Sequence, residues 1–210
     1  MKPFVDIEGS GELNTIITST VSADEAPTGT VDGADNTEMR FLTVQNTKNN
    51  NSGGESGIAI VNEDVSPRFT HVSANSSGDS VGFYVGISNQ GSSQPTMTDV
   101  TASASGNSSR NVGVEILGGS TTMIGVTASA SGSRNPNTGV QIDNGSATIR
   151  QSKLSATGSG QDLALANDGG SAKIAVSQLV GGIQAGGNSV QCFDNYDENM
   201  APVNCRSAAP

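Results

Sequence analysis

The stretch VTASASG at residues 100–106 occurs again at residues 126–132, 26 positions later. Looser copies of this unit run along most of the chain, and each opens on a large apolar residue. The successive spacings are 28, 28, 26, 26 and 25 residues, and the opening residues are Phe41, Phe69, Met97, Met123, Ile149 and Ile174. A repeat of this length is typical of solenoids, whose units cannot bury an apolar face alone and stack on their neighbours.

Within each unit apolar and polar residues alternate with a period of two, which indicates half-buried β-strands. Turns rich in Gly, Ser and Asn separate these strands. We align a closing apolar pair in each unit: Ile58/Ile60, Val85/Ile87, Val114/Ile116, Val140/Ile142 and Leu163/Leu165. No long apolar pattern of helical period is present, so we expect an all-β chain.

A polar column follows the closing pairs. Two positions after each pair the sequence has Asn62, Asn89, Gly118, Asn144 and Asn167. Asn and Gly tolerate the left-handed backbone conformation, and stacked Asn side chains can bond to one another along a solenoid. We therefore expect a structural ladder made of Asn62, Asn89, Asn144 and Asn167.

The repeats resemble the right-handed parallel β-helix proteins of the pectate-lyase-like superfamily, especially its small bacterial secreted members. The stretches that carry the resemblance are residues 66–74, 94–102, 121–128 and 172–179, and the segment around CFDNY at residues 192–196. It covers about residues 39–205. The resemblance implies a right-handed β-helix of about six coils with N- and C-terminal caps. It leaves activity open, because the superfamily includes lyases, glycosidases, adhesins, tailspikes and inert scaffolds.

The ends of the chain differ from the repeats. Residues 39–190 hold the β-helix, residues 1–38 form an acidic N-terminal cap or an irregular first coil, and residues 191–210 form a C-terminal cap. Cys192 and Cys205 enclose twelve residues. This pair suits a disulfide that closes the C-terminal cap in an oxidising compartment, and two free thiols in a cytosolic protein are the alternative.

Composition and charge limit the partners. Hydrophobic residues make up 33% of the chain and aromatic residues 3%, which suits a thin stacked core better than a thick one. The net charge is −10, and the repeats are electrically balanced. Without a basic stripe, nucleic acid is not an expected partner, and no apolar stretch is long enough for membrane insertion. The start of the chain lacks the apolar segment of a signal peptide, so a secreted, cell-surface or periplasmic location requires another export route or a removed presequence.

Two outward carboxylates are the best catalytic candidates. Glu115 and Asp143 lie diagonally on neighbouring coils, about 7–8 Å apart, which falls within the rough 6.5–9.5 Å window of inverting glycosidases. Tyr84 in the coil before offers a face for stacking on a sugar. Two solvated surface acids are the alternative. One carboxylate among the five aligned outward positions is too few for calcium, so no metal or cofactor is expected.

Hydroxyl side chains suggest a separate binding surface. Thr101, Ser103, Thr127 and Ser129, with their neighbours Ser73/Asn75 and Ser155/Thr157, form a neutral array that suits a glycan, a partner or ice. An ordinary solvated strand face is the alternative, since Thr favours strands. His71, the single histidine, occupies the same coil position as Asp99, and stacking brings the two within about 5 Å.

These patterns favour a non-enzymatic extracellular β-helix module that is structural, adhesive or carbohydrate-contacting. Its partner is then a glycan or cell-surface polymer, and a homo-oligomer is compatible with the pattern. The alternative is a polysaccharide-active enzyme, a glycoside hydrolase or tailspike-like protein, that uses Glu115 and Asp143. A lesser alternative is ice or glycan binding through the Thr/Ser rows.

Overall fold

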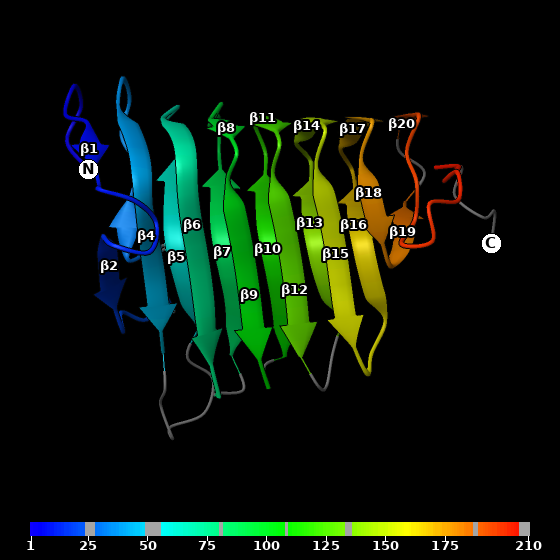
Figure 1. Ribbon diagram of the computed structural model, residues 1–210, viewed down its shortest axis with the longest axis horizontal. Helices are drawn as coiled ribbons and strands as arrows, with labels where there is room; N and C mark the ends of the chain where they lie inside the picture. Colours follow the sequence, from blue (N-terminus) through cyan, green and yellow to red (C-terminus); the bar gives the residue numbers. More distant parts are fainter. Residues whose placement is uncertain are drawn as a thin grey trace.

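The computed structural model describes residues 1–23, 28–48, 56–79, 82–107, 109–132, 136–186 and 189–205. These residues form twenty strands and no helix, so the expected all-β class is confirmed. The named strands pair in parallel and build a solenoid of about six coils, stacked side by side along the long axis in Figure 1. β1 and β20 lie at opposite ends of the stack.

Sheet A, the larger sheet, has thirteen strands. At its N-terminal end are β1 (Ile7–Glu8), β2 (Ile16–Ser19), and the long strands β4 (Glu38–Thr47) and β6 (Arg68–Gly78). Beyond β6 the sheet continues as two rows. The upper row contains β8 (Thr96–Thr98), β11 (Ser120–Ile124), β14 (Ser146–Arg150), β17 (Ser171–Ala175) and β20 (Ser189–Phe193). The lower row contains β9 (Thr101–Gly106), β12 (Thr127–Gly132), β15 (Lys153–Gly158) and β18 (Gln178–Val180).

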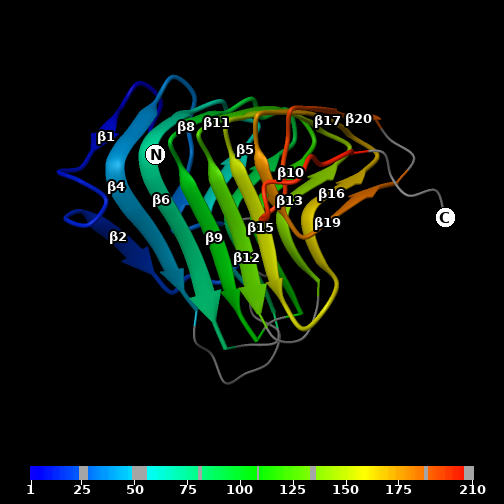
Figure 2. The same cartoon turned by 45° about the vertical axis from the view of Figure 1, so that its right-hand side comes forward.

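Sheet B has seven strands and closes the opposite side of the solenoid, as the turned view in Figure 2 shows. Its strands are β3 (Val31–Asp32), β5 (Gly57–Glu63), β7 (Phe83–Gln90), β10 (Arg110–Leu117), β13 (Asn137–Asp143), β16 (Asp162–Asp168) and β19 (Gly182–Ala185). Each coil therefore runs from sheet B through the upper row to the lower row of sheet A.

A single residue with positive φ turns the chain between the upper and lower rows. We call these residues the corner row: Phe41, His71, Asp99, Gly125, Gln151, Val176 and Asp194, with φ between 50° and 66°. Bulky residues seldom adopt this conformation, and for a β-branched residue such as Val176 it is an outlier. The turn needs one left-handed residue in every coil, and the sequence supplies glycine only once.

The interior is a thin stack of apolar side chains. Phe69, Met97, Met123, Ile149 and Ile174 are buried in one register row, as the repeat predicts. The first residue of that row is Met39, however, which pairs with Phe69 and is fully buried. Phe41 was therefore assigned wrongly. It occupies the corner row, where its side chain is 38% exposed, because the first coil is two residues longer than the repeat suggests.

Two of the closing pairs are also shifted. Val85 pairs with Val112 and Ile87 with Val114, so the third pair is Val112/Val114 and the fourth is Thr138/Val140. Both lie two residues before the expected positions. The pattern is ambiguous here, because Val112, Val114 and Ile116 alternate regularly and fit two registers equally well. Ile116 and Ile142 instead occupy the buried row that Asn89 and Asn167 hold in other coils.

The asparagine ladder is consequently interrupted. Asn62 donates to Asn89 (Nδ2 to Oδ1, 2.8 Å), and both are buried, but Ile116 and Ile142 separate them from Asn167. Asn144 is exposed with φ at 59° and lies in a turn outside this row. Its place in the ladder was a wrong prediction, which follows from the two-residue shift of the fourth pair.

A second interior ladder was not expected. The Asn111 side chain donates to Asn137 (Nδ2 to Oδ1, 3.0 Å), and Asn137 donates to Asp162 (Nδ2 to Oδ1, 2.8 Å). The two amides also donate to backbone carbonyls of Gly106, Ser131, Gly132 and Thr157. Buried amides of this kind satisfy carbonyl groups at the ends of the sheet A strands. The ladder thus joins three coils from the inside.

The C-terminal end is closed covalently. Cys192 and Cys205 form a disulfide, which confirms that prediction. β20, which contains Cys192, continues the upper row beside β17. The division into caps at residues 1–38 and 191–210 around repeats at 39–190 stays a prediction. In the part of the chain that the structure describes, no helix is long and apolar enough to span a membrane.

Candidate functional site

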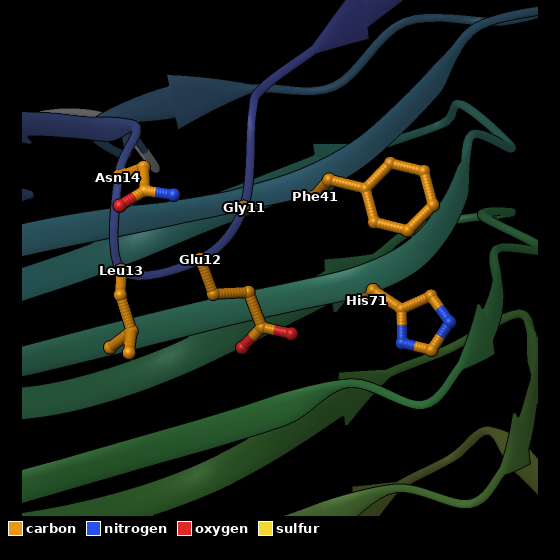
Figure 3. A pocket seen from close by; sticks show the side chains of 6 residues that line it. All are labelled: Gly11, Glu12, Leu13, Asn14, Phe41 and His71. Carbon is orange, nitrogen blue, oxygen red and sulfur yellow. The ribbon is translucent and has the colours of Figure 1, made fainter.

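The corner row brings three side chains together at the N-terminal end of the solenoid. The rings of Phe41 and His71 stack with centroids 5.3 Å apart and planes 16° from parallel. His71 Nε2 lies 3.9 Å from Asp99 Oδ2, so the predicted His71–Asp99 proximity is confirmed. Phe41 and His71 line a depression together with the loop at residues 11–14 (Figure 3).

The hydroxyl rows lie on the outer face of the lower row. Thr101 pairs with Thr127 and Ser103 with Ser129, and all four alternate with buried alanines. On the next coil the residues that pair with Thr127 and Ser129 are Lys153 and Ser155. The predicted continuation at Ser155/Thr157 is therefore wrong by two residues. Ser103 donates to Asn75 (Oγ to Oδ1, 2.6 Å), which satisfies part of the array internally.

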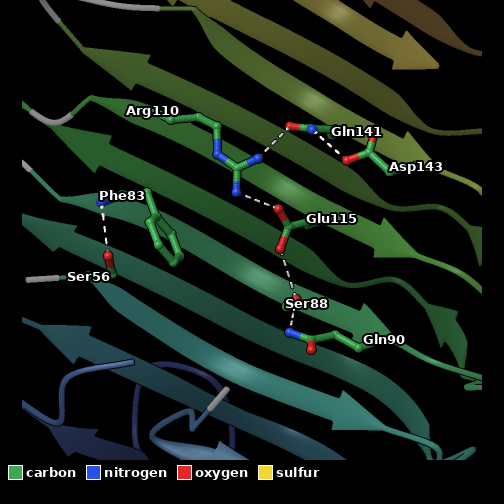
Figure 4. Close-up of polar contacts among 8 residues, drawn as sticks. All are labelled: Ser56, Phe83, Ser88, Gln90, Arg110, Glu115, Gln141 and Asp143. Carbon is green, nitrogen blue, oxygen red and sulfur yellow. Dashed lines mark hydrogen bonds and ion pairs between the residues drawn. The ribbon is translucent and has the colours of Figure 1, made fainter. Parts of the chain in front are cut away.

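A polar network crosses the outer face of sheet B. Its centre is Glu115, whose side chain is only 4% exposed. Ser88 donates to Glu115 Oε2 at 3.0 Å, and Arg110 Nη2 lies 2.5 Å from Oε1. These two donors compensate the buried charge, and without them its burial is costly. Three neighbouring strands, β7, β10 and β13, contribute to the network, as Figure 4 shows.

Arg110 connects this centre to the second carboxylate. Its Nη1 donates to Gln141 Oε1 at 3.1 Å, and Gln141 Nε2 donates to Asp143 Oδ2 at 2.8 Å. The guanidinium also lies over the ring of Phe83, 5.4 Å from its centroid, a favourable cation–π geometry. The network therefore fixes the position of an arginine that is still about one-third exposed.

The structure brings Glu115 and Asp143 together as the sequence predicts. Glu115 is the register partner of Gln141, and Asp143 follows two residues later on the same strand, so the carboxylates are diagonal neighbours. Asp143 is half-buried, whereas Glu115 is almost fully buried. Neither is a simple solvated surface acid, because a chain of hydrogen bonds links them through Arg110 and Gln141.

Tyr84 does not lie in this site, contrary to the prediction. It is fully buried, and its hydroxyl donates to the backbone oxygen of Lys48 at 3.3 Å. A Cβ on Gly78 would lie 2.3 Å from this hydroxyl, and one on Gly106 would lie 2.9 Å from the ring. The two glycines thus make the space that the ring fills. Because it is buried, Tyr84 cannot stack on a sugar.

The sequence analysis missed Arg110, Gln141 and Ser88 as site residues. Arg110 and Glu115 are five positions apart, which places them on opposite faces of an ideal strand. Their contact shows that alternation is broken within β10, and the register skips Gly113. Among the described residues no group of three or more His, Cys, Asp and Glu side chains is placed to share a metal ion.

Comparison with known proteins gives structural matches alone. No family model matches the chain, and no curated protein matches it. A pectin methylesterase from carrot is similar in structure, with a TM-score of 0.59 and 13% identity over 95% of this chain and 72% of that one. A pectin methylesterase in complex with a hexasaccharide has a TM-score of 0.55 and 11% identity over 96% of this chain and 77% of that one.

The fold is the right-handed parallel β-helix that these two pectin methylesterases share. The right-handed parallel β-helix implied by the sequence resemblance is thereby confirmed. The preference for a non-enzymatic structural or adhesive module is corrected, because both of these structural neighbours are named as pectin methylesterases, which are enzymes. That preference rested on the lack of a repeated catalytic residue, and the network on sheet B consists of residues that do not repeat.

Proposed function

We propose that the protein is a polysaccharide-active hydrolase, with Glu115 and Asp143 as its catalytic carboxyl pair. The observation that carries this proposal is the hydrogen-bonded network on the outer face of sheet B. It joins two diagonal carboxylates to an accessible arginine. Diagonal neighbours in a sheet lie about 7–8 Å apart. This separation leaves room for a water molecule between a general base and a general acid, as in inverting glycoside hydrolysis.

The surroundings of each carboxylate support a division of roles. Glu115 accepts from Arg110 and Ser88, and a carboxylate has about four acceptor sites, which leaves room for a bond from water. We assign it as the base that takes a proton from the attacking water. Asp143 accepts from Gln141 at Oδ2, and Oδ1 is then available to carry a proton. We assign it as the acid that protonates the glycosidic oxygen as the C–O bond breaks.

Hydrolysis of a carboxylic ester is the second candidate. It is favoured by the names of both structural neighbours, which are pectin methylesterases. In that reaction water attacks the ester carbonyl and methanol leaves, while Arg110 and Gln141 offer donors to the developing oxyanion. A secreted or cell-surface location agrees with the disulfide and with an extracellular polysaccharide as substrate.

The test is a depolymerisation and de-esterification panel. The protein is incubated with methyl-esterified and de-esterified polygalacturonate, xylan, mannan and soluble cellulose derivatives. New reducing ends report glycoside hydrolysis, and methanol reports ester hydrolysis. We expect one of these products from at least one polymer, and at least a hundredfold loss of rate for Asp143→Asn.

Asp168→Asn is the matched control. Asp168 pairs in register with Asp143 on the next strand, but it is exposed. We expect its rate to stay within about threefold of the wild type. The proposal is overturned if no polymer yields either product, or if the two variants lose activity equally.

If the product is a new reducing end, an aryl glycoside with a good leaving group separates the two roles. Such a substrate needs little acid assistance, so Asp143→Asn recovers most of its rate and Glu115→Gln does not.

A further inference from the structure

A depression on sheet A remains outside the proposed catalytic network. It is lined by Gly11, Glu12, Leu13, Asn14, Phe41 and His71, and we call it the corner pocket (Figure 3). Its volume of about 530 Å³ falls in the range of small-ligand sites. The catalytic network lies on sheet B, whereas Phe41 and His71 belong to β4 and β6 of sheet A.

The apolar side chains of the pocket face water and contribute little burial to the core. Leu13 is 94% exposed and Phe41 is 38% exposed, although both are large apolar residues. Phe41 and His71 stack with their ring planes 16° from parallel, and both rings line the pocket. The positive φ of both residues belongs to the turn that every coil makes, so the case for a binding site rests on this exposed apolar surface.

The polar part of the pocket is held in position. Ser73 donates to Glu12 Oε2 at 2.5 Å, so the carboxylate is anchored by one oxygen. Asn14 donates from Nδ2 to the backbone oxygen of Ser10 at 3.3 Å, and its side-chain oxygen stays available as an acceptor. His71 adds ring nitrogens at the other edge, next to Asp99. Acceptors and donors thus surround an aromatic and aliphatic surface.

We propose that the corner pocket binds one pyranose unit of a polysaccharide, at a position separate from the hydrolytic network. A pyranose has an apolar C–H face and a rim of hydroxyl groups. The C–H face packs on Leu13 and the Phe41–His71 stack, and the hydroxyls bond to Glu12 and Asn14. The inference rests on the proposed function only for the class of polymer. The corner pocket would hold a polysaccharide chain on the solenoid without contributing to bond cleavage.

The single histidine makes this proposal directly measurable. His71 gives the one imidazole Cε1–H signal in a carbon-13 NMR spectrum of the protein. Asp143→Asn protein is titrated with hexasaccharides of galacturonate, methyl-esterified galacturonate, xylose, mannose and glucose. We expect a saturable shift of the His71 signal with at least one of them.

Substitutions in the corner row test the pocket without disturbing the turn. Asn tolerates positive φ, so Phe41→Asn removes the ring and preserves the left-handed conformation. We expect Phe41→Asn and Leu13→Ser each to weaken binding at least tenfold. Gln151→Asn, in the same corner row but outside the pocket, is the matched control and leaves the affinity unchanged.

Two failures are distinguishable. A His71 signal that does not move with any hexasaccharide, while the wild type hydrolyses a polymer, overturns the corner pocket and leaves the proposed function standing. A saturable shift with no hydrolysis of any polymer overturns the proposed function and supports the pocket. An affinity that is equal in Phe41→Asn and wild type overturns the pocket in either case.

Discussion

The outer faces of the two sheets have opposite characters. On the lower row of sheet A, equivalent positions in successive coils repeat the same residue types, as in Thr101 and Thr127 or Ser103 and Ser129. On sheet B, the column through Glu115 changes at every coil and contains Val61, Ser88, Glu115, Gln141 and Ala166. A repeated column is what stacking alone requires. The sheet B column instead changes from coil to coil, and at its centre Ser88 donates to Glu115, so it carries more than stacking requires.

The faces also differ in burial. The Thr and Ser side chains of the lower row are half-buried in an even layer, as expected of a strand face that meets water. Glu115 is 3% exposed although it carries a charge, and Asp143 and Arg110 remain partly accessible beside it. Charged residues are rarely buried unless they are paired. The contrast separates a face that supports the fold from the face on which we propose the reaction.

The largest expected effect is on activity. Glu115→Gln retains the size of the side chain but cannot take a proton from water, so we expect a loss of at least a hundredfold in kcat/KM. Thr148→Ala on the upper row of sheet A should leave kcat/KM within about twofold. Rates are measured on the polymer that the panel identifies. Equal losses in the two variants contradict the division between the faces.

The next prediction concerns stability and compares a buried asparagine, Asn137, with an exposed one, Asn144. Asn137 is fully buried and bonds to Asn111, Asp162 and two carbonyls, so Asn137→Ala should cost about 3 kcal/mol of unfolding free energy. Asn144→Ala, in an exposed turn with positive φ, should cost about 1 kcal/mol. Denaturant unfolding followed by circular dichroism measures both. Similar costs would mean that the interior ladder carries no more stability than a turn.

Removing the arginine should have an intermediate effect on stability. Arg110→Met leaves Glu115 buried without its ion pair, and we expect a cost of about 2 kcal/mol because Ser88 still donates to it. Adding Glu115→Leu should recover most of this loss.

Arg40→Met is the control for that experiment. It breaks a pair with Glu8 and Glu38 in which both carboxylates are more accessible to water than Glu115, and it should cost less than about 1 kcal/mol. A larger cost for Arg40→Met than for Arg110→Met would contradict the contrast between the faces.

A smaller effect of opposite sign is expected in the corner row. Val176 is 53% exposed and has a φ of 52°, so little burial is lost when it is replaced. Val176→Asn relieves the strain of a β-branched residue in a left-handed turn and should stabilise the protein by about 1 kcal/mol. Thermal unfolding measures the gain. A lower Tm would show that the corner tolerates Val without strain.

The smallest effect is a dependence on pH. Backbone and hydroxyl hydrogen bonds from Ser92 lower the pKa of Asp64 below its ordinary value. The folded-state pKa is therefore below the unfolded one. Its contribution to stability is present above the unfolded pKa and is lost as pH falls through the folded pKa. We expect the Tm difference between wild type and Asp64→Asn to shrink from pH 6 to pH 2.5, and a constant difference contradicts this.

The sequence predicts the fold well because residues one repeat apart stack on one another in neighbouring coils. The buried row from Phe69 to Ile174 and the diagonal relation of Glu115 to Asp143 follow from period and register alone. The errors arise where two registers satisfy the same alternation, as at Val112, Val114 and Ile116. They also arise at Phe41, where the chain departs from the repeat length and an apolar residue faces water.

The candidate site is less predictable for a related reason. Arg110 reaches Glu115 only because strand alternation is broken within β10, and alternation is the rule on which the sequence analysis depends. Tyr84 was misplaced because its burial depends on space left by Gly78 and Gly106, which belong to other strands. Both features arise from packing between coils, which a single strand pattern does not contain.

The disulfide between Cys192 and Cys205 makes the two ends of the solenoid unequal in their resistance to unfolding. In a solenoid each coil is held by its immediate neighbours, so separation begins at an end and spreads inward. The covalent closure hinders that start at the C-terminal end. Unravelling is then expected to proceed from β1 and β2 towards β20, and hydrogen exchange should be fastest in the first coil and slow progressively along the chain. The disulfide therefore makes the N-terminal coil the expected starting point of unfolding.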